Sequence, residues 1–385
     1  MLNLPRTSLL LAGWLAVVSF AGCGSSTPAI PPGTTGPTTG TATTAKDPSK
    51  LPDDADLLKQ IDDALDFTLE KRRLDVKDQA AWQIIHGALA YKRKFLVRAG
   101  DKDVPAVEYA LGGGQMKGWH LEEGDVIDEK TGRRGVRALL EGGSLAGQGH
   151  YDQWMGYLSD TGLKLEEKVM VEGKEHTIAD YVRQIELDVP RNMEREYSWT
   201  IMALTAYHPT DHKWTASDGK EWSLAQLVET ELSYNIDESP CGGTHRMYGL
   251  ALVRNRHLAA GGKLEGIWQK CEEKIQAEIA RAKASQNTDG SLSSKYFQRP
   301  ASAPDITEWM ASSGHVFEFL AEALTKEQLT KEDLDAPWMK RAAWKLCEQF
   351  RKTKAVDVEC ARLFHATHGL VLYREKVFGP REFGK

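Results

Sequence analysis

The sequence lacks the features by which several classes of protein are recognised. It contains five cysteines and no Cys-x-x-Cys pair, so a structural zinc knuckle is not expected. No stripe of Lys and Arg with interleaved aromatic residues occurs, which argues against a nucleic-acid partner. The run Gly112-Gly113-Gly114 is not followed by the Lys-Ser/Thr of a phosphate-binding loop, so nucleotide binding is not indicated.

A short apolar run stands near the start of the chain. Arg6 precedes it, and it ends at Ala21-Gly22-Cys23, too short for a comfortable membrane span. The segment VSFAGC resembles the lipobox of bacterial lipoproteins, in which the Cys becomes lipidated. Residues 1–23 are therefore predicted to be a lipoprotein signal peptide with Cys23 as the lipidation site. An ordinary cleaved signal and an uncleaved anchor are the alternatives.

Residues 24–50 are rich in Pro, Thr and Gly and contain no aromatic residue. Such a segment cannot bury a core and is predicted to be disordered. Behind a lipidated Cys it would hold a domain away from a membrane surface. The folded domain is expected to span residues 51–385, in an exported protein that is lipid-anchored to a membrane of the bacterial cell envelope.

Four cysteines remain in this domain: Cys241, Cys271, Cys347 and Cys360. In an exported protein this even count allows disulfides, with three connectivities. Cys347 and Cys360 flank a predicted helix turn and are the expected pair.

A repeated unit dominates residues 51–385. Apolar residues recur at spacings of three and four, which predicts helices. The segment EGKEHTIADYV at 172–182 recurs as DGKEWSLAQLV at 218–228, each with a Gly turn before an N-cap residue, Thr177 or Ser223. The same offset places YSWTIMALTA, from residue 197, on GTHRMYGLAL, from residue 243. The repeating unit is therefore predicted to be a pair of helices.

Six such pairs are expected. The first helix of each pair carries charges on one face, whereas the second is rich in Gly, Ala, Leu, Tyr and Trp, as a buried helix is. The outer helices are predicted near 54–72, 134–141, 177–188, 223–233, 264–284 and 337–351, and the inner helices near 78–94, 149–160, 196–207, 243–256, 311–324 and 357–373. This alternation predicts an all-α fold, an α6/α6 toroid of six helical hairpins. An open solenoid would show the same repeats.

The inner helices share a frame that is best preserved in HRMYGLALV, from His245, and HATHGLVLY, from His365. In five of the six inner helices a polar or aromatic residue is followed four positions later by a small one, on the same helix face; His315 is followed by Phe319. The first position holds His86, Asp152, Trp199, His245, His315 and His365, with His150 as the alternative to Asp152. The small residues allow close packing, and the polar groups are predicted to converge at the mouth of a central cavity.

Histidine serves as an acid, a base or a metal ligand near neutral pH. The predicted catalytic residues are His245, His365 and Asp152 for proton transfer and Arg246 and Tyr248 for charge stabilisation. The predicted cavity-lining residues are His86, His150, Trp199, His315, Glu318 and His368. Each of them can equally have a structural role, and neither a metal site nor a cofactor can be assigned from the sequence.

Two segments, 95–133 and 285–307, are predicted to be long loops, which in a compact domain are usually functional or disordered. Trp119, His120 and Glu122 in the first segment would suit a lid over the cavity mouth.

The segment QNTDGSLSSKYF at 286–297 resembles the Gln-and-Gly turn of the terpenoid cyclase and protein prenyltransferase toroids. Gln286, Asp289 and Gly290 match, whereas Leu292 stands where an aromatic residue is expected. The resemblance implies a ring of helical hairpins but transfers little chemistry. The cyclase acid motif is not matched by the Asp53-Asp54-Ala55-Asp56 order, and Ser291 replaces the zinc-binding Cys of the prenyltransferases. The same ring also hosts polysaccharide lyases and sugar hydrolases.

Three functional hypotheses remain. The first is an enzyme that binds and processes a glycan or related small ligand by His/Asp acid–base chemistry. The second is a non-catalytic binding or scaffolding lipoprotein, and the third is a terpenoid cyclase-like or prenyltransferase-like enzyme. The expected partners are a membrane, through the lipid anchor, and a glycan or other small molecule.

Overall fold

The computed structural model describes residues 52–192, 196–330, 337–356, 358 and 360–384. A compact unit spans Pro48–Lys385 and is described here by itself. Cys23, the predicted signal peptide 1–23 and the predicted linker 24–50 lie outside the described residues. Within the described part, the chain forms thirteen α-helices and nine short strands, and none of these helices is long and apolar enough to cross a membrane.

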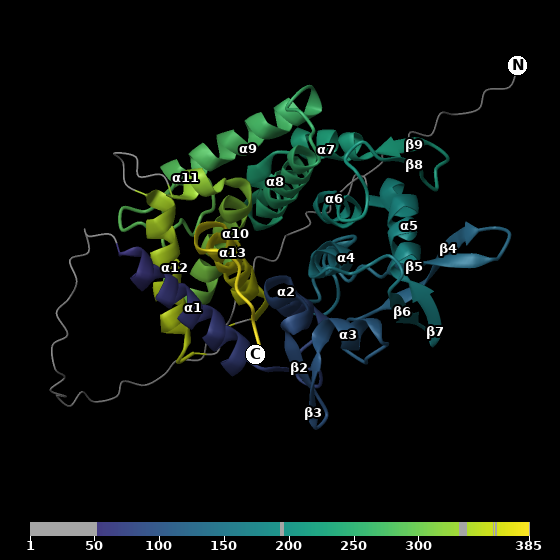
Figure 1. Cartoon of the computed structure of the whole chain (residues 1–385), viewed down its shortest axis with the longest axis horizontal. Coiled ribbons are helices and arrows are strands. Elements are labelled where there is room, and N and C mark those ends of the chain that lie inside the picture. Colours follow the sequence, from purple (N-terminus) through teal and green to yellow (C-terminus); the bar gives the residue numbers. More distant parts are fainter. Residues whose placement is uncertain (1–51, 193–195, 331–336, 357, 359, 385) are drawn as a thin grey trace, which may run out of the picture. The chain divides into compact units, whose positions relative to one another are not determined.

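Six helices, here called the inner helices, each contact the next along the chain, and the last contacts the first. They are α2 (Ala81–Tyr91), α4 (Gln153–Leu158), α6 (Ser198–Thr205), α8 (Thr244–Ala259), α10 (Ile306–Ala323) and α13 (Cys360–Phe378). Figure 1 shows them surrounded by helices on the periphery. All six inner helices overlap the predicted segments, although α8, α10 and α13 extend beyond the predicted bounds. They are largely buried on all sides, as their composition predicts.

The peripheral helices are α1 (Asp54–Lys71), α3 (Ala106–Leu111), α5 (Ile178–Asp188), α7 (Leu224–Ser233), α9 (Ile267–Ala284) and α12 (Trp338–Thr353), with a short α11 (Lys326–Thr330). Five of the six predicted outer helices are present. The helix predicted at 134–141 is wrong, because residues 133–138 form strand β5 (Arg133–Ala138), paired with β4 (Leu121–Asp128). Val136 and Ala138 are buried, whereas Arg137 between them is only half-buried, as in a strand with one face on the core.

The described part of the chain is mostly helical, as predicted, but antiparallel β-hairpins lead directly into three of the peripheral helices. The pairs are β2 (Leu96–Ala99) with β3 (Lys102–Pro105) before α3, β6 (Lys168–Val171) with β7 (Lys174–Thr177) before α5, and β8 (Lys213–Thr215) with β9 (Glu221–Ser223) before α7. A two-residue strand β1 (Leu74–Asp75) pairs in parallel with β2. The repeated Gly turns are hairpin turns, with φ of 80° at Gly173 and 74° at Gly219. Thr177 and Ser223 cap α5 and α7 as predicted.

The two segments predicted to be long loops differ. Residues 95–133 are not a loop, because they contain β2, β3, α3 and β4. Residues 285–305 have neither helix nor strand. Within them, the Gln286 side-chain amide donates hydrogen bonds to the carbonyl oxygens of Gly290 at 2.8 Å and Trp338 at 3.0 Å. Gln286 thus joins this turn to the first residue of α12.

None of the four described cysteines forms a disulfide, so the expected Cys347–Cys360 pair is wrong. Cys347 is buried in the core face of α12. Cys360 begins α13, and its thiol donates to the Val358 carbonyl at 3.6 Å. The two residues therefore serve different helices rather than a cross-link.

Glycines allow neighbouring inner helices to approach closely, as the shared frame predicts. A Cβ on Gly249 of α8 would lie 3.2 Å from the Ser198 Cα of α6. A Cβ on Gly369 of α13 would lie 2.9 Å from the Glu318 backbone nitrogen of α10. Because these neighbours are backbone atoms, they cannot give way by a side-chain rotation.

Gly369→Ala is expected to lower the free energy of unfolding by about 1–3 kcal/mol, since the added methyl must push α10 and α13 apart. Gly149→Ala is the control, because its Cβ would meet only ordinary contacts, the nearest at 3.4 Å. Urea unfolding of both variants measures the difference. Equal stability of the two would show that the close approach is not a constraint.

Candidate functional site

Five histidine rings meet among the inner helices. They are His86 of α2, His150 just before α4, His245 of α8, His315 of α10 and His365 of α13, here called the histidine cluster. The ring centroids are 3.9 Å apart for His315 and His365, 5.1 Å for His86 and His365, 5.2 Å for His245 and His315, and 5.3 Å for His150 and His245. The predicted convergence of His86, His245, His315 and His365 is therefore observed.

Two aromatic residues complete the cluster. Trp199 of α6, a predicted cavity-lining residue, lies 4.9 Å from His245 between ring centroids. Tyr157 of α4 places its hydroxyl 3.1 Å from His86 Nε2 and 3.4 Å from His365 Nε2. Burial raises the pKa of Tyr157 well above its ordinary value, so the phenol stays protonated. The sequence frame did not single out Tyr157, although it directly follows Gly156.

Glu318 holds two histidines from α13. Its carboxylate oxygens lie 2.8 Å from His365 Nδ1 and 2.6 Å from His368 Nδ1. Burial raises the pKa of Glu318, but the attraction and hydrogen bonds of His365 and His368 outweigh it and hold the pKa well below its ordinary range. Tyr248 packs near this group, with its ring centroid 5.9 Å from that of His368.

Two histidines are fixed by their own helices. His86 Nδ1 lies 2.5 Å from the Trp82 carbonyl oxygen, and His315 Nδ1 lies 2.5 Å from that of Ala311. A proton on Nδ1 makes each of these bonds, which leaves Nε2 with its lone pair. Burial lowers the pKa of His86 well below 6.5 and that of His315 to about 3, with the nearby His365 adding to both effects. Both imidazoles are therefore neutral at physiological pH.

His245 differs from the other members of the cluster. It is 6% exposed, and neither Nδ1 nor Nε2 has a hydrogen-bond partner. Burial lowers its pKa, and the neighbouring histidines add to the effect. A buried polar group without a partner is costly, so an unpaired imidazole at the centre of a cluster calls for a bound group.

The space beside the histidine cluster is small. The cavity lined by Tyr157, Trp199, His245, Tyr248, Glu318, His365 and neighbouring apolar residues is much smaller than the usual small-molecule site. It has room for about one water molecule, not for a sugar. The predicted open mouth lined by these residues is therefore not observed.

Asp152 does not join the histidine cluster. It caps α4 with a left-handed backbone, φ 61°, and its Oδ2 accepts a hydrogen bond from Thr200 at 2.6 Å. His150, the alternative residue, is the one that reaches the cluster, and its Nδ1 pairs with Glu196. The four-residue spacing predicted for the inner helices does not hold here, because α4 begins only at Gln153 and the Asp152 backbone before it is left-handed.

Asp152 instead lines an open pocket of about 770 Å³ between the β4–β5 hairpin and α5, here called the side pocket. Two buried polar atoms of its lining have no hydrogen-bond partner, the Tyr181 hydroxyl and Asn192 Oδ1. Burial raises the pKa of the Asp152 carboxyl to about 7, against the lowering effect of the Thr200 hydrogen bond. The side pocket thus combines unused hydrogen-bonding groups with a carboxyl group that titrates near neutral pH.

Arg246 belongs to a buried ion pair. Its guanidinium donates to Glu231 Oε1 at 2.7 Å and to Ser239 Oγ at 2.9 Å, and it stacks on the Tyr234 ring at 3.9 Å. Glu231 also accepts from the Tyr197 backbone N–H at 2.6 Å. Arg246, which was predicted to stabilise charge in catalysis, thus links α7 to the start of α8.

The residues predicted to form a lid lie on the β4–β5 side of the domain. Trp119 packs on Trp154 at 5.8 Å between ring centroids, and His120 pairs with Glu141. Glu122 lines both the side pocket and an adjoining groove of about 1140 Å³. They form part of a wall rather than a cover over the histidine cluster.

Comparison of the chain with known protein families, with curated proteins and with solved structures finds no match. The arguments for function therefore rest on the geometry of the chain itself.

Arg246→Ala is expected to lower the free energy of unfolding by about 3–5 kcal/mol, because it leaves the Glu231 carboxylate buried and unpaired. The double variant Arg246→Met/Glu231→Leu should recover much of this loss, since no charge then remains buried. Urea denaturation distinguishes the cases. An unaltered midpoint in the single variant would contradict the structural role of the ion pair.

His86 should make stability depend on pH. Its lowered pKa in the folded state means that only the unfolded chain binds a proton as the pH falls below 6.5, so stability is lost in that range. The slope from one histidine is at most about 1.4 kcal/mol per pH unit. Subtracting the unfolding free energy of His86→Gln from that of the wild type, between pH 7.5 and 5, isolates this slope. Parallel profiles would mean that His86 is charged in the folded protein.

Proposed function

We propose that residues 51–385 form a closed α/α toroid of the general kind seen in terpenoid cyclases and protein prenyltransferases. The closed order of contacts among the six inner helices supports this proposal. We also propose that Cys23 is lipidated and that residues 24–50 tether the domain to a membrane of the cell envelope. The sequence VSFAGC and the composition of the linker support this part.

We propose further that the domain binds a glycan in the side pocket and processes it by acid–base chemistry. The observation that carries this is the meeting of the Asp152 carboxyl with two unpartnered polar atoms, the Tyr181 hydroxyl and Asn192 Oδ1. The adjoining groove shares Glu122 and Leu139 with the side pocket, so the two can accept an extended ligand. A chain of sugars suits such a groove better than a compact metabolite does.

Asp152 is the proposed proton donor and acceptor. A carboxyl with a pKa of about 7 has both forms available near neutral pH, which suits general acid–base catalysis. The phenol of Tyr181 and the amide oxygen of Asn192 would orient hydroxyl groups of the sugar. This assignment replaces His245 and His365, because the cavity beside them does not admit a sugar. The same cavity is too small for a terpenoid substrate, so it gives no support to terpenoid chemistry either.

A screen of the full chain against neutral and acidic envelope glycans tests the proposal, with Asp152→Asn as the diagnostic variant. Asn tolerates the left-handed backbone of this position, so the fold should be kept. Turnover should fall by at least about 100-fold with ligand affinity nearly unchanged. Tyr181→Phe should weaken binding about two- to tenfold, through one lost hydrogen bond.

Asp211→Asn is the matched control, because Asp211 is exposed and lies outside the side pocket. It should leave both turnover and binding unchanged. Glycan binding without turnover in the wild type would support the non-catalytic alternative, a binding lipoprotein. No binding to any glycan would overturn the proposal.

A further inference from the structure

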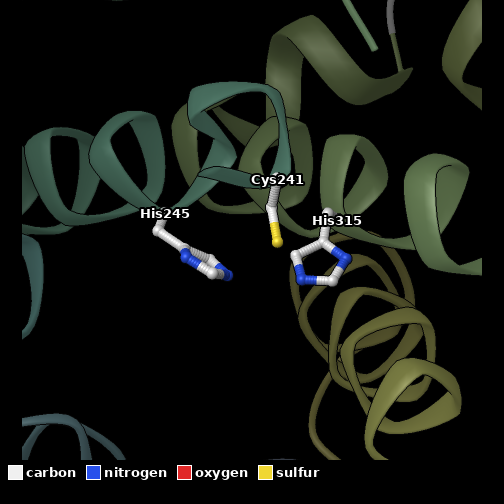
Figure 2. A group of neighbouring side chains, drawn as sticks. All are labelled: Cys241, His245 and His315. Carbon is white, nitrogen blue, oxygen red and sulfur yellow. The ribbon is translucent and has the colours of Figure 1, made fainter. Parts of the chain in front are cut away.

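We propose that Cys241, His245 and His315 bind a zinc ion at the edge of the histidine cluster. One potential ligand atom from each residue lies within 4.8 Å of the other two. Figure 2 shows the thiol of Cys241 between the two rings, with all three side chains directed toward one space. One thiolate and two imidazoles form a ligand set typical of zinc.

An unusual backbone turn positions the Cys241 thiol. Cys241 has φ 50°, and Gly242 and Gly243 follow with φ of 61° and 73°, so three left-handed residues in succession precede α8. The left-handed conformation is unfavourable for Cys, and such strain often accompanies functional sites. The turn brings residue 241 back over the first turn of α8, where His245 lies.

The surroundings of His315 and His245 suit both residues to bind a metal ion. His315 uses Nδ1 for the Ala311 carbonyl, and this bond directs its Nε2 lone pair outward, as second-sphere hydrogen bonds do for zinc-bound histidines. His245 is buried, and neither of its ring nitrogens has a hydrogen-bond partner. A metal ion would satisfy one of these nitrogens and remove the cost of leaving it unpaired.

The donor atoms of the three residues can adopt the spacing of a tetrahedral zinc site. At the usual zinc–ligand bond lengths, the donor atoms of a tetrahedral site lie roughly 3.3–3.7 Å apart. Because the three donor atoms lie no more than 4.8 Å apart, each distance has to shorten by at most about 1.5 Å. Three protein ligands leave a fourth position for water, which the small neighbouring cavity can hold.

Charge and proton balance are also satisfied. On binding, the S–H bond of Cys241 breaks, the sulfur–zinc bond forms with the electron pair of sulfur, and the proton passes to solvent. One thiolate and two neutral imidazoles leave a net charge of +1 at the ion. A carboxylate oxygen of Glu196 lies within 4.8 Å of a His245 ring nitrogen and offsets part of this charge.

Two other groups have similar spacing but are less suited to a metal. His150 and Glu196, which with His245 make the second group, already pair with each other, and Trp199 donates to Glu196 Oε1 at 3.1 Å. In the third group, His212 Nε2 lies 2.7 Å from Glu186 Oε1, and Glu186 also accepts from Arg183 at 2.7 Å. In each of these two groups a histidine already pairs with the carboxylate, so a metal ion would have to displace an existing ion pair.

The test is a titration of the full-length protein with zinc after chelator treatment, together with cobalt substitution. One tight equivalent of zinc should bind and release a proton. Cobalt should give the near-ultraviolet charge-transfer absorption of a thiolate ligand. Cys241→Ser should abolish that absorption and weaken zinc binding by more than about 100-fold, a larger effect than the loss of a second-sphere partner. His315→Gln should weaken binding similarly.

Cys360→Ser is the matched control and should change neither signal, because Cys360 lies outside the proposed site. Melting curves of each metal-free variant establish that it is folded. Glu196→Gln and Glu186→Gln report on the two other groups. The proposal is overturned if zinc does not bind tightly, if the cobalt form lacks thiolate absorption, or if binding is lost in either Glu variant but kept in Cys241→Ser.

Discussion

The close approach of the inner helices is the constraint on which the rest of the structure depends. Where Gly249 meets Ser198 and Gly369 meets Glu318, backbone lies against backbone with no room for a side chain between. One helical turn earlier on the same faces stand His245 and His365. Helices packed this closely must bring these rings together, so the histidine cluster follows from the packing of small residues below it.

Much of this arrangement could be predicted from the sequence because it depends on local periodicity. The frame of a polar residue followed by a small one identified four members of the cluster, and the repeat around Thr177 and Ser223 identified two helix starts. The three β-hairpins before α3, α5 and α7 were missed because their strands are only three or four residues long. A third copy of the hairpin-and-helix pattern is visible in hindsight, since KDVPAVEYA at 102–110 aligns with KEHTIADYV at 174–182.

The errors at the site have a different cause. Asp152 was predicted to join the cluster on the assumption that the inner helix already includes residue 152. Its backbone is left-handed, however, and α4 begins only after it. Tyr157 and Cys241 also reach the cluster, but neither occupies the polar position of the repeated pattern of a polar residue followed by a small one. The side pocket could not be predicted, because it combines residues from β5, α5 and the start of α4 that are brought together only by tertiary packing. Whether a polar atom is buried without a hydrogen-bond partner also depends on the tertiary structure, so it could not be predicted from the sequence.

The short segment from His150 to Asp152 touches both regions of interest. His150 contacts the imidazole of His245, while two residues later Asp152 faces the side pocket. His150 and Asp152 thus share one short stretch of backbone. A ligand that shifts this stretch from one side would change the affinity of the other site, and because thermodynamic coupling is reciprocal, each ligand would change the affinity for the other by the same factor.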